Sequence, residues 1–275
     1  MENSRFGRDF ELVVRVGTKD VIINPPFRVV FDGTDSESGG LNKIQIQLYN
    51  LPERKRLLLV KDREGPAIIP VSFSVGYENN LQLLFKGAID VGQNERQGPD
   101  IITTIGCKDG LDTLDAFTAR TVKGGQTAVN ALIEDMPVTT AGKITERPVL
   151  TRPKVLVGNS LLLIEETIGP GESLFIKDEK LYILKSNEVL GRFTPLVNAA
   201  TGLISTPTRE ANIVTFQTLM NPSIKIGKLA QLQSVTAPHL DGIYKIRDIN
   251  YSGDNYGDDW SMSCTGLLSS DWVTL

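Results

Sequence analysis

Short segments that alternate polar and apolar residues recur along most of the chain, and they constrain its fold more than any other feature. In the clearest one, residues 43–49, the apolar Ile44, Ile46 and Leu48 alternate with lysine, glutamine and tyrosine. Successive side chains of a strand point to opposite faces of the sheet, so this alternation is typical of a strand buried on one face. Further strands are expected near residues 27–31, 69–75, 81–91, 101–107, 213–217, 229–235, 243–251 and 260–267. The chain is therefore predicted to be mainly β.

Turn residues and short helical patterns divide these strands. Residues 92–99 and 252–259 are rich in glycine, asparagine and aspartate and are predicted to be hairpin tips. Two helices are expected, one at 128–133 and one at 161–167, the second capped by the Asn-Ser pair that precedes it. Residues 138–153 are poor in large apolar side chains and are interpreted as a linker or extended arm. A charged turn at 177–180 is expected to join two strands of a small hairpin.

The two ends of the chain resemble each other. Gly87 begins a strand that leads through a glycine-containing tip to a strand ending in Cys107, and Gly242 and Cys264 stand at nearly the same separation. This similarity indicates a duplicated small β-barrel, although antiparallel meanders also converge on such patterns by chance. The predicted division is a first barrel domain at 1–115, a small mixed α/β domain at 116–192, and a second barrel domain at 193–275.

Charge and composition exclude several classes of function. The formal net charge is −4, and the densest basic cluster, Arg54 to Arg56, is short. Binding of nucleic acid through phosphate neutralisation is therefore not expected to be the main function. No run of 18 apolar residues occurs, so no membrane insertion is expected. Two cysteines imply no disulfide framework and fit synthesis in a reducing cytoplasm.

Catalytic groups are sparse. The single histidine, His239, lies between a proline and a leucine without a Gly-x-Ser-x-Gly motif, so it is interpreted as a loop residue. Glu165 and Glu166 are adjacent on the expected helix and point in different directions, which makes them a poor acid/base pair for a glycosidase. Gly124 and Gly125 lack the lysine and hydroxyl residue of a phosphate-binding loop. No catalytic or cofactor-binding residue is predicted, and the chain is not expected to be an enzyme.

No metal site is predicted either. Cys107, Cys264 and His239 match no metal-ligand spacing, and both cysteines are expected to be small buried side chains at equivalent core positions. The acidic run at 254–259 lacks the later glutamate of a calcium loop and is explained by the preference of asparagine and aspartate for tight turns. Trp260 is expected in the core. The apolar C-terminal residues 267–275, including Trp272, are expected to dock, with a partner or neighbouring subunit as one hypothesis.

Several segments, taken in order, resemble the baseplate hub proteins of contractile-tailed phages. The strand that ends in Tyr49-Asn50-Leu51 is similar to an early strand of that family. The other matching segments are Val75-Gly76-Tyr77 with Leu84 to Ile89, Asp100 to Thr103 with Cys107 to Gly110, Leu181 to Leu184, Thr201 to Pro207, Leu219 to Pro222 with Gly227, and Gly242 to Ile246 with Trp260 and Cys264. The resemblance covers residues 40–267, apart from the arm at 138–153.

The resemblance implies a fold and a role. Family members have two small tail-tube-like β-barrel domains with a small mixed α/β domain between them. The chain is then expected to form a homotrimeric, pseudo-hexameric ring in the virion baseplate, after assembly in the host cytoplasm. The implied partners are the hexameric tail tube protein, the trimeric spike protein and other baseplate proteins, and DNA would pass through the ring during ejection. An alternative is a tube-end adaptor or spike-base component of a related contractile injection machine.

Overall fold

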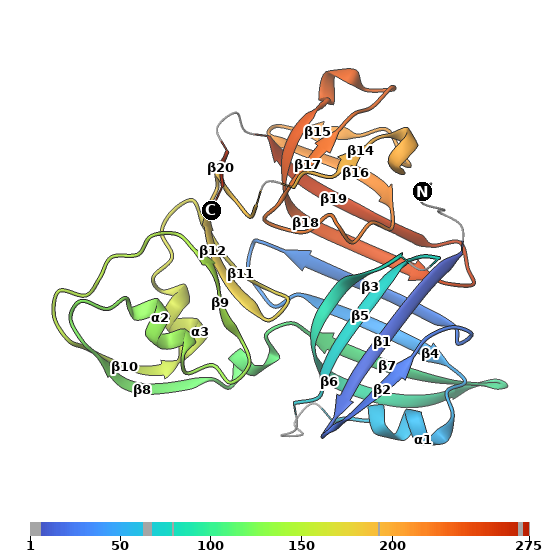
Figure 1. Ribbon diagram of the computed structural model, residues 1–275, viewed down its shortest axis with the longest axis horizontal. Coiled ribbons are helices and arrows are strands. Elements are labelled where there is room, and N and C mark those ends of the chain that lie inside the picture. The colour runs from blue at the N-terminus through green and yellow to red at the C-terminus, as the bar shows by residue number, and fades with distance from the viewer. Residues whose placement is uncertain (1–6, 63–67, 79, 192, 269–271, 275) are drawn as a thin grey trace.

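One large, mostly antiparallel sheet organises the chain. The computed structural model describes residues 7–62, 68–78, 80–191, 193–268 and 272–274 (Figure 1). The sheet has thirteen strands in this part of the chain. They are β1 (Arg8–Val16), β2 (Lys19–Ile23), β3 (Val29–Ser36), β4 (Lys43–Tyr49), β5 (Pro70–Tyr77), β6 (Asn80–Gln97), β7 (Asp100–Lys108), β14 (Leu196–Val197), β15 (Thr208–Glu210), β16 (Ile213–Leu219), β17 (Leu229–Leu232), β18 (Gly242–Asp254) and β19 (Trp260–Leu268). The predicted mainly-β class is confirmed.

The strand order repeats within this sheet. Its main path is β15-β16-β19-β18-β3-β4-β7-β6-β5-β1-β2, and β17 pairs with β18 off that path. The chain therefore builds the same five-strand arrangement twice. We call β3-β4-β7-β6-β5 the first unit and β15-β16-β19-β18-β17 the second unit. In each unit the long hairpin, β6–β7 or β18–β19, carries a register shift typical of a β-bulge.

The bulges show how the two units correspond residue by residue. The first bulge lies opposite Cys107 and Gly106, and the second lies opposite Gly266 and Thr265. Cys107 therefore corresponds to Gly266, and Cys264 lies two positions away from that point. The expectation that the cysteines occupy equivalent positions is wrong, although both are buried free thiols as expected.

The two units share one sheet and one core. Strand β3 pairs with β4 on one side and with β18 on the other, so the units join edge to edge. The pairings of the described strands do not close either unit into a barrel, because the path runs from β15 to β2 without returning. Phe31 lies at the junction, with its ring centroid 5.0 Å from that of Phe73 and 5.4 Å from that of Trp260. The predicted core position of Trp260 is confirmed.

The middle segment has its own small core and lies to one side of the large sheet (Figure 1). It contains β8 (Phe117–Val122) paired with β10 (Lys154–Asn159), and β9 (Thr140–Ile144), β11 (Glu172–Lys177) and β12 (Lys180–Lys185) in a second sheet. Its helices are α2 (Ala128–Ile133) and α3 (Ser160–Glu165), and the Asn159 side chain caps α3 as predicted by accepting from the Leu162 N–H. The arm at 138–153 is not merely a linker, because β9 pairs in parallel with β12.

Short elements complete the chain. A helix α1 (Glu53–Arg56) and four 3₁₀ turns, η1 (Leu57–Leu59), η2 (Leu111–Leu114), η3 (Ala199–Thr201) and η4 (Pro238–Leu240), connect the strands. Strand β20 (Val273–Thr274) pairs with β13 (Glu188–Val189), so this part of the C-terminal segment docks on its own chain. Docking with a partner or neighbouring subunit stays a prediction. The rest of the predicted docking tail, 269–271 and 275, lies outside the described residues. In the part of the chain that the structure describes, no helix is long and apolar enough to cross a membrane.

Two predictions of strand extent need correction. The hairpin tips predicted at 92–99 and 252–259 are shorter, because β6 continues to Gln97 and β18 to Asp254. Backbone ladder bonds extend these strands through residues whose polar side chains resemble a turn. The first two strands were not predicted, although Phe10, Leu12 and Val14 alternate there and are fully buried.

Candidate functional site: a polar sheet face and a buried charged junction

The face of the large sheet opposite its core is polar across both units. Because each strand alternates, the same pattern that buries Ile44 and Ile46 turns the intervening residues outward. The pairing register aligns these residues in rows that cross the junction between the units. One row contains Gln217, Ser263, Asn250, Thr34, Lys43 and Lys108, and a parallel row contains Ser261, Ser252, Asp32, Gln45, Gly106 and Val91.

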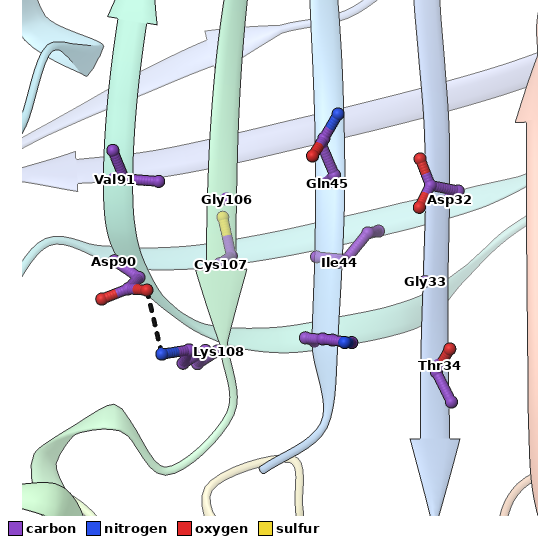
Figure 2. A pocket seen from close by; sticks show the side chains of 11 residues that line it. Asp32, Gly33, Thr34, Ile44, Gln45, Asp90, Val91, Gly106, Cys107 and Lys108 are labelled. Carbon is purple, nitrogen blue, oxygen red and sulfur yellow. Dashed lines mark ion pairs between the residues drawn. The ribbon is translucent and has the colours of Figure 1, made fainter. Parts of the chain in front are cut away.

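Two shallow hollows lie on this polar face, one on each side of β3. They have volumes of about 300 and 320 Å³ and share Asp32, Gly33 and Thr34. In the first hollow, Lys108 and Asp90 form an ion pair with 3.0 Å between Nζ and Oδ2 (Figure 2). Opposite charges thus neutralise each other within the hollow, and the surface offers hydrogen bonds without a concentrated positive charge.

Across the junction the polar rows are connected by hydrogen bonds. The Thr34 hydroxyl donates to the Asn250 side-chain oxygen at 2.9 Å, which joins β3 of the first unit to β18 of the second. The Ser36 hydroxyl donates to the Asp248 carboxylate at 2.5 Å one step further along the same pair of strands. These contacts hold the polar face continuous where the two units meet.

Behind this face, two buried ion pairs lie close to the end of β3. The Lys177 ammonium is 2.6 Å from the Asp35 carboxylate and donates to the Leu84 carbonyl oxygen at 2.9 Å. The Lys245 ammonium is 3.2 Å from the Glu37 carboxylate, and both side chains are inaccessible to solvent. Removing charges from water is costly, so each of these ions depends on its partner.

The tip of the β11–β12 hairpin connects these pairs to both units. Asp178 and Glu179 have φ of 55° and 61°, which allows a two-residue turn. Their backbone N–H groups donate to the Asp109 carboxylate at 2.6 and 2.9 Å. Lys225 of the second unit is 2.7 Å from Asp178, and Lys86 of the first unit is 2.5 Å from Glu179. The middle segment therefore contacts both units where they join.

Burial perturbs the ionisation of this junction. It raises the pKa of Glu37 to about 7 and that of Asp109 to about 7. It also raises the pKa of Asp35, against the attraction of Lys177. Burial acts to lower the pKa of Lys177, but the surrounding carboxylates, with Asp35 foremost, outweigh it and raise that pKa. The lysine therefore stays charged while the acids become harder to ionise.

The raised pKa of Glu37 predicts a pH-dependent stability. A glutamate in the unfolded chain releases its proton near pH 4.5, whereas the folded chain retains it until about pH 7. The free energy of unfolding is therefore expected to fall as the pH rises through this window and to level off above it. Glu37→Gln is expected to flatten the slope, measured by urea unfolding at several pH values between 4 and 8. The control Glu166→Gln, on an exposed carboxyl, should retain the wild-type slope; equal slopes in all three proteins would contradict the assignment.

The structure does not bring the few chemically reactive residues of the sequence together. His239 is exposed in η4, and Glu165 and Glu166 are exposed at the end of α3. Gly124 and Gly125 form an exposed turn in which the Gly125 N–H donates to the Leu150 carbonyl oxygen. Burial raises the pKa of Cys107 well above its usual range and that of Cys264 to about 12, so both thiols stay protonated.

The acidic run at 254–259 is organised by arginines. Arg28 pairs with the Asp254 carboxylate at 2.7 Å, and the Arg8 guanidinium donates to the carbonyl oxygens of Asp254, Gly257 and Asp258. The described residues contain no group of three or more histidine, cysteine, aspartate or glutamate side chains placed to hold a metal ion. The loop thus has the role of a turn that ties β1 to the β18–β19 hairpin.

Sequence reasoning missed the buried junction. The sequence predicts an ordinary charged turn at 177–180. Asp35, the ion-pair partner of Lys177, lies 142 residues away in the sequence. No local pattern marks such a pair, because its burial arises only when β3, β6 and the β11–β12 hairpin meet. The one available signal is the apolar strand on each side of the charged run.

The described part of the chain is a mainly β protein whose large open sheet contains two equivalent five-strand units and one continuous polar face. Residues 10–266 match the family described as "Baseplate hub gp41", and the chain belongs to that family. It is accordingly a structural baseplate component of the virion tail, and not an enzyme. No curated protein matches the sequence significantly.

Solved structures share the fold at low sequence identity. A tail protein from Neisseria meningitidis matches with a TM-score of 0.60 and 11% identity, over 97% of this chain and 98% of that one. The 43 kDa tail protein of prophage MuSo2 from Shewanella oneidensis matches with a TM-score of 0.61 and 10% identity, over 94% and 98%. The E. coli protein c3393 matches with a TM-score of 0.64 and 11% identity, over 94% and 77%; it is described as a type VI secretion component structurally similar to the T4 tail proteins gp27 and gp5.

Proposed function

We propose that three copies of this chain form a pseudo-hexameric ring that joins the hexameric tail tube to the trimeric central spike. The repetition of the five-strand unit carries this proposal. A trimer can match a six-fold partner only if each chain presents two similar surfaces, and the two units supply them. The likeness to c3393, itself described as similar to the T4 tail proteins gp27 and gp5, supports a place among the tail and baseplate proteins.

The division of the chain follows the same proposal. Residues 1–115 and 193–275 would act as two tail-tube-like barrel domains, with 116–192 as the small mixed domain between them. The separate core of the middle segment, from Ala116 to Ile183, supports this division. Since neither unit closes on itself, the barrel character would be completed by neighbouring sheets in the ring.

The polar face would line the channel through which DNA passes. Its rows of serine, threonine, asparagine and glutamine cross both units, and Lys108 on this face is paired with Asp90. Tight binding of DNA requires many uncompensated positive charges, each of which releases counterions. A neutral, hydrated surface would therefore let the DNA slide, and no specific nucleic-acid binding is involved.

Added positive charge on the polar face should slow DNA passage. The triple variant Gln45→Lys, Gln217→Lys, Asn250→Lys is expected to eject DNA more slowly at low salt than at high salt, because phosphate attraction is screened by ions. The measurement is triggered ejection from assembled particles, followed with a DNA-binding dye.

A matched control places the same charge elsewhere. Gln126→Lys, Asn130→Lys and Thr151→Lys lie at exposed positions of the middle segment, away from the polar face. This variant is expected to eject at the wild-type rate at every salt concentration. If both triple variants behave alike, the polar face does not line the channel.

A second candidate is a tube-end adaptor or spike-base component of a related contractile injection machine. The similarity to a type VI secretion component favours it. The two functions differ in the cargo and the neighbours of the ring, so imaging the chain within its particle distinguishes them.

A further inference from the structure

The pairing of β3 with β18, which joins the two units of one chain, shows how the equivalent edges of two chains can pair. Along one edge of β18, residues 242–245 pair with β17 and residues 248–254 pair with β3. Within the second stretch, Ile249 lies opposite Asp35 and Tyr251 lies opposite Gly33. In this junction, β3 of the first unit pairs with residues 248–254 of β18. We call these residues, which lie toward the hairpin tip, the outer half of β18, and the equivalent residues 91–97 the outer half of β6.

The bulges identify the equivalent edges that remain. The residue after the bulge is Asp248 in β18 and Val91 in β6, so Ile249 corresponds to Gly92 and Tyr251 to Asn94. The same alignment relates β3 to β15, because β3 is the outermost strand of the first unit, next to β4, and β15 is the outermost strand of the second unit, next to β16. Gly33 pairs with Ile44, and its equivalent Arg209 pairs with Val214.

Both equivalent edges are open along most of their length. In the described residues, β15 pairs only with β16, and residues 208–210 are exposed. Among the residues that the structure describes, the edge of β6 beyond β5 makes one isolated bridge, between Gly92 and Lys61, and residues 95–97 are exposed. Open edges present unpaired backbone N–H and C=O groups that favour pairing with another chain.

Strand β15 matches the free part of the β6 edge in length. On β18, Ile249 pairs with Asp35 of β3, whereas on β6 the equivalent residue, Gly92, already pairs with Lys61. Strand β15 ends at Glu210, and Ala211 turns away with a φ of 50° at the place that corresponds to Asp35. The short strand β15 therefore fits the part of the β6 edge that Lys61 leaves free, and a longer strand would collide with it.

We infer that β15 of one copy pairs antiparallel with the outer half of β6 of the next copy. This inference rests on the proposed ring and gives its contact between chains. Arg209 would lie opposite Asn94 and Thr208 opposite Glu95, as Gly33 and Asp32 lie opposite Tyr251 and Ser252 within the chain. The contact is head-to-tail, so it leaves neither of these two edges open when the ring closes. The large sheets of all copies then form one continuous wall, with their polar faces on the same side.

Paired cysteines test this register in assembled baseplates. Thr208→Cys with Glu95→Cys is expected to give covalent dimers and trimers on a non-reducing gel, because directly opposite strand residues meet the geometry of a disulfide. Asp32→Cys with Ser252→Cys places the same link within one chain and is expected to give a cross-linked monomer. Thr208→Cys with Gln97→Cys shifts the register by two residues and is expected to cross-link far less.

The outcomes separate this inference from the proposed ring. Copy number in the same baseplates is measured by quantitative mass spectrometry against the tube protein. Three copies per baseplate with no cross-link at Thr208 and Glu95, or with equal cross-linking in the shifted pair, would overturn the strand pairing and leave the ring intact. A copy number other than three would overturn the proposed ring and this inference with it.

Discussion

Replacing Asp35 with alanine is expected to lower the free energy of unfolding by about 3–5 kcal/mol, because it leaves the buried Lys177 charge without its partner. The loss should exceed that of any exposed ion pair, since solvent cannot reach the orphaned ammonium. Urea unfolding at pH 8, followed by tryptophan fluorescence, measures it.

Two further variants show whether the charge or the packing is responsible. The double variant Asp35→Leu, Lys177→Met removes both charges and is expected to recover much of the lost stability, because an apolar pair can replace a buried ion pair at little cost. Asp20→Ala breaks the exposed pair with Arg15 and should leave stability almost unchanged. A double variant as unstable as Asp35→Ala would show that the pairing of charges is not the cause.

Replacing Phe31 with alanine is expected to cost about 3–5 kcal/mol, the range for removing a buried aromatic side chain. Phe31 is 2% exposed and contacts Phe73 of the first unit and Trp260 of the second. Its loss therefore opens a cavity where the two units meet. The free energy of unfolding from urea titration measures the effect.

Phe117→Ala is the matched control, because Phe117 is 65% exposed on β8. It is expected to change stability by less than about 0.5 kcal/mol. If the two variants lose similar stability, or if Phe31→Ala unfolds in two separate steps, the units do not share a single core.

Local pattern predicted most of the strands, because alternation is a property of a few consecutive residues. The segments at 43–49, 128–133 and 213–217 illustrate this: each carries its own periodicity, and the structure has an element there. The predicted similarity of the chain ends is also reflected in the strand order. Local pattern does not predict where these strands end, since β6 and β18 continue through turn-like residues that pair with β7 and β19 along the backbone.

The joining of the two units could not be predicted from the sequence. Strand β3 pairs with β18 more than 200 positions along the chain, for example Thr34 with Asn250 at a separation of 216. Neither segment differs in composition from strands that pair locally. The same holds for the buried ions at the junction, whose isolated sequence context is that of a charged turn. Such features depend on which edges meet, and no short-range pattern encodes that choice.

Electron cryomicroscopy of the isolated tail tip tests the central claim most directly. The account predicts a ring of three copies between the tube and the spike, with six five-strand units around the axis and the row that contains Thr34, Asn250 and Ser263 facing the channel. A ring with six copies of the chain, or one whose channel is lined by another face of the large sheet, would contradict it.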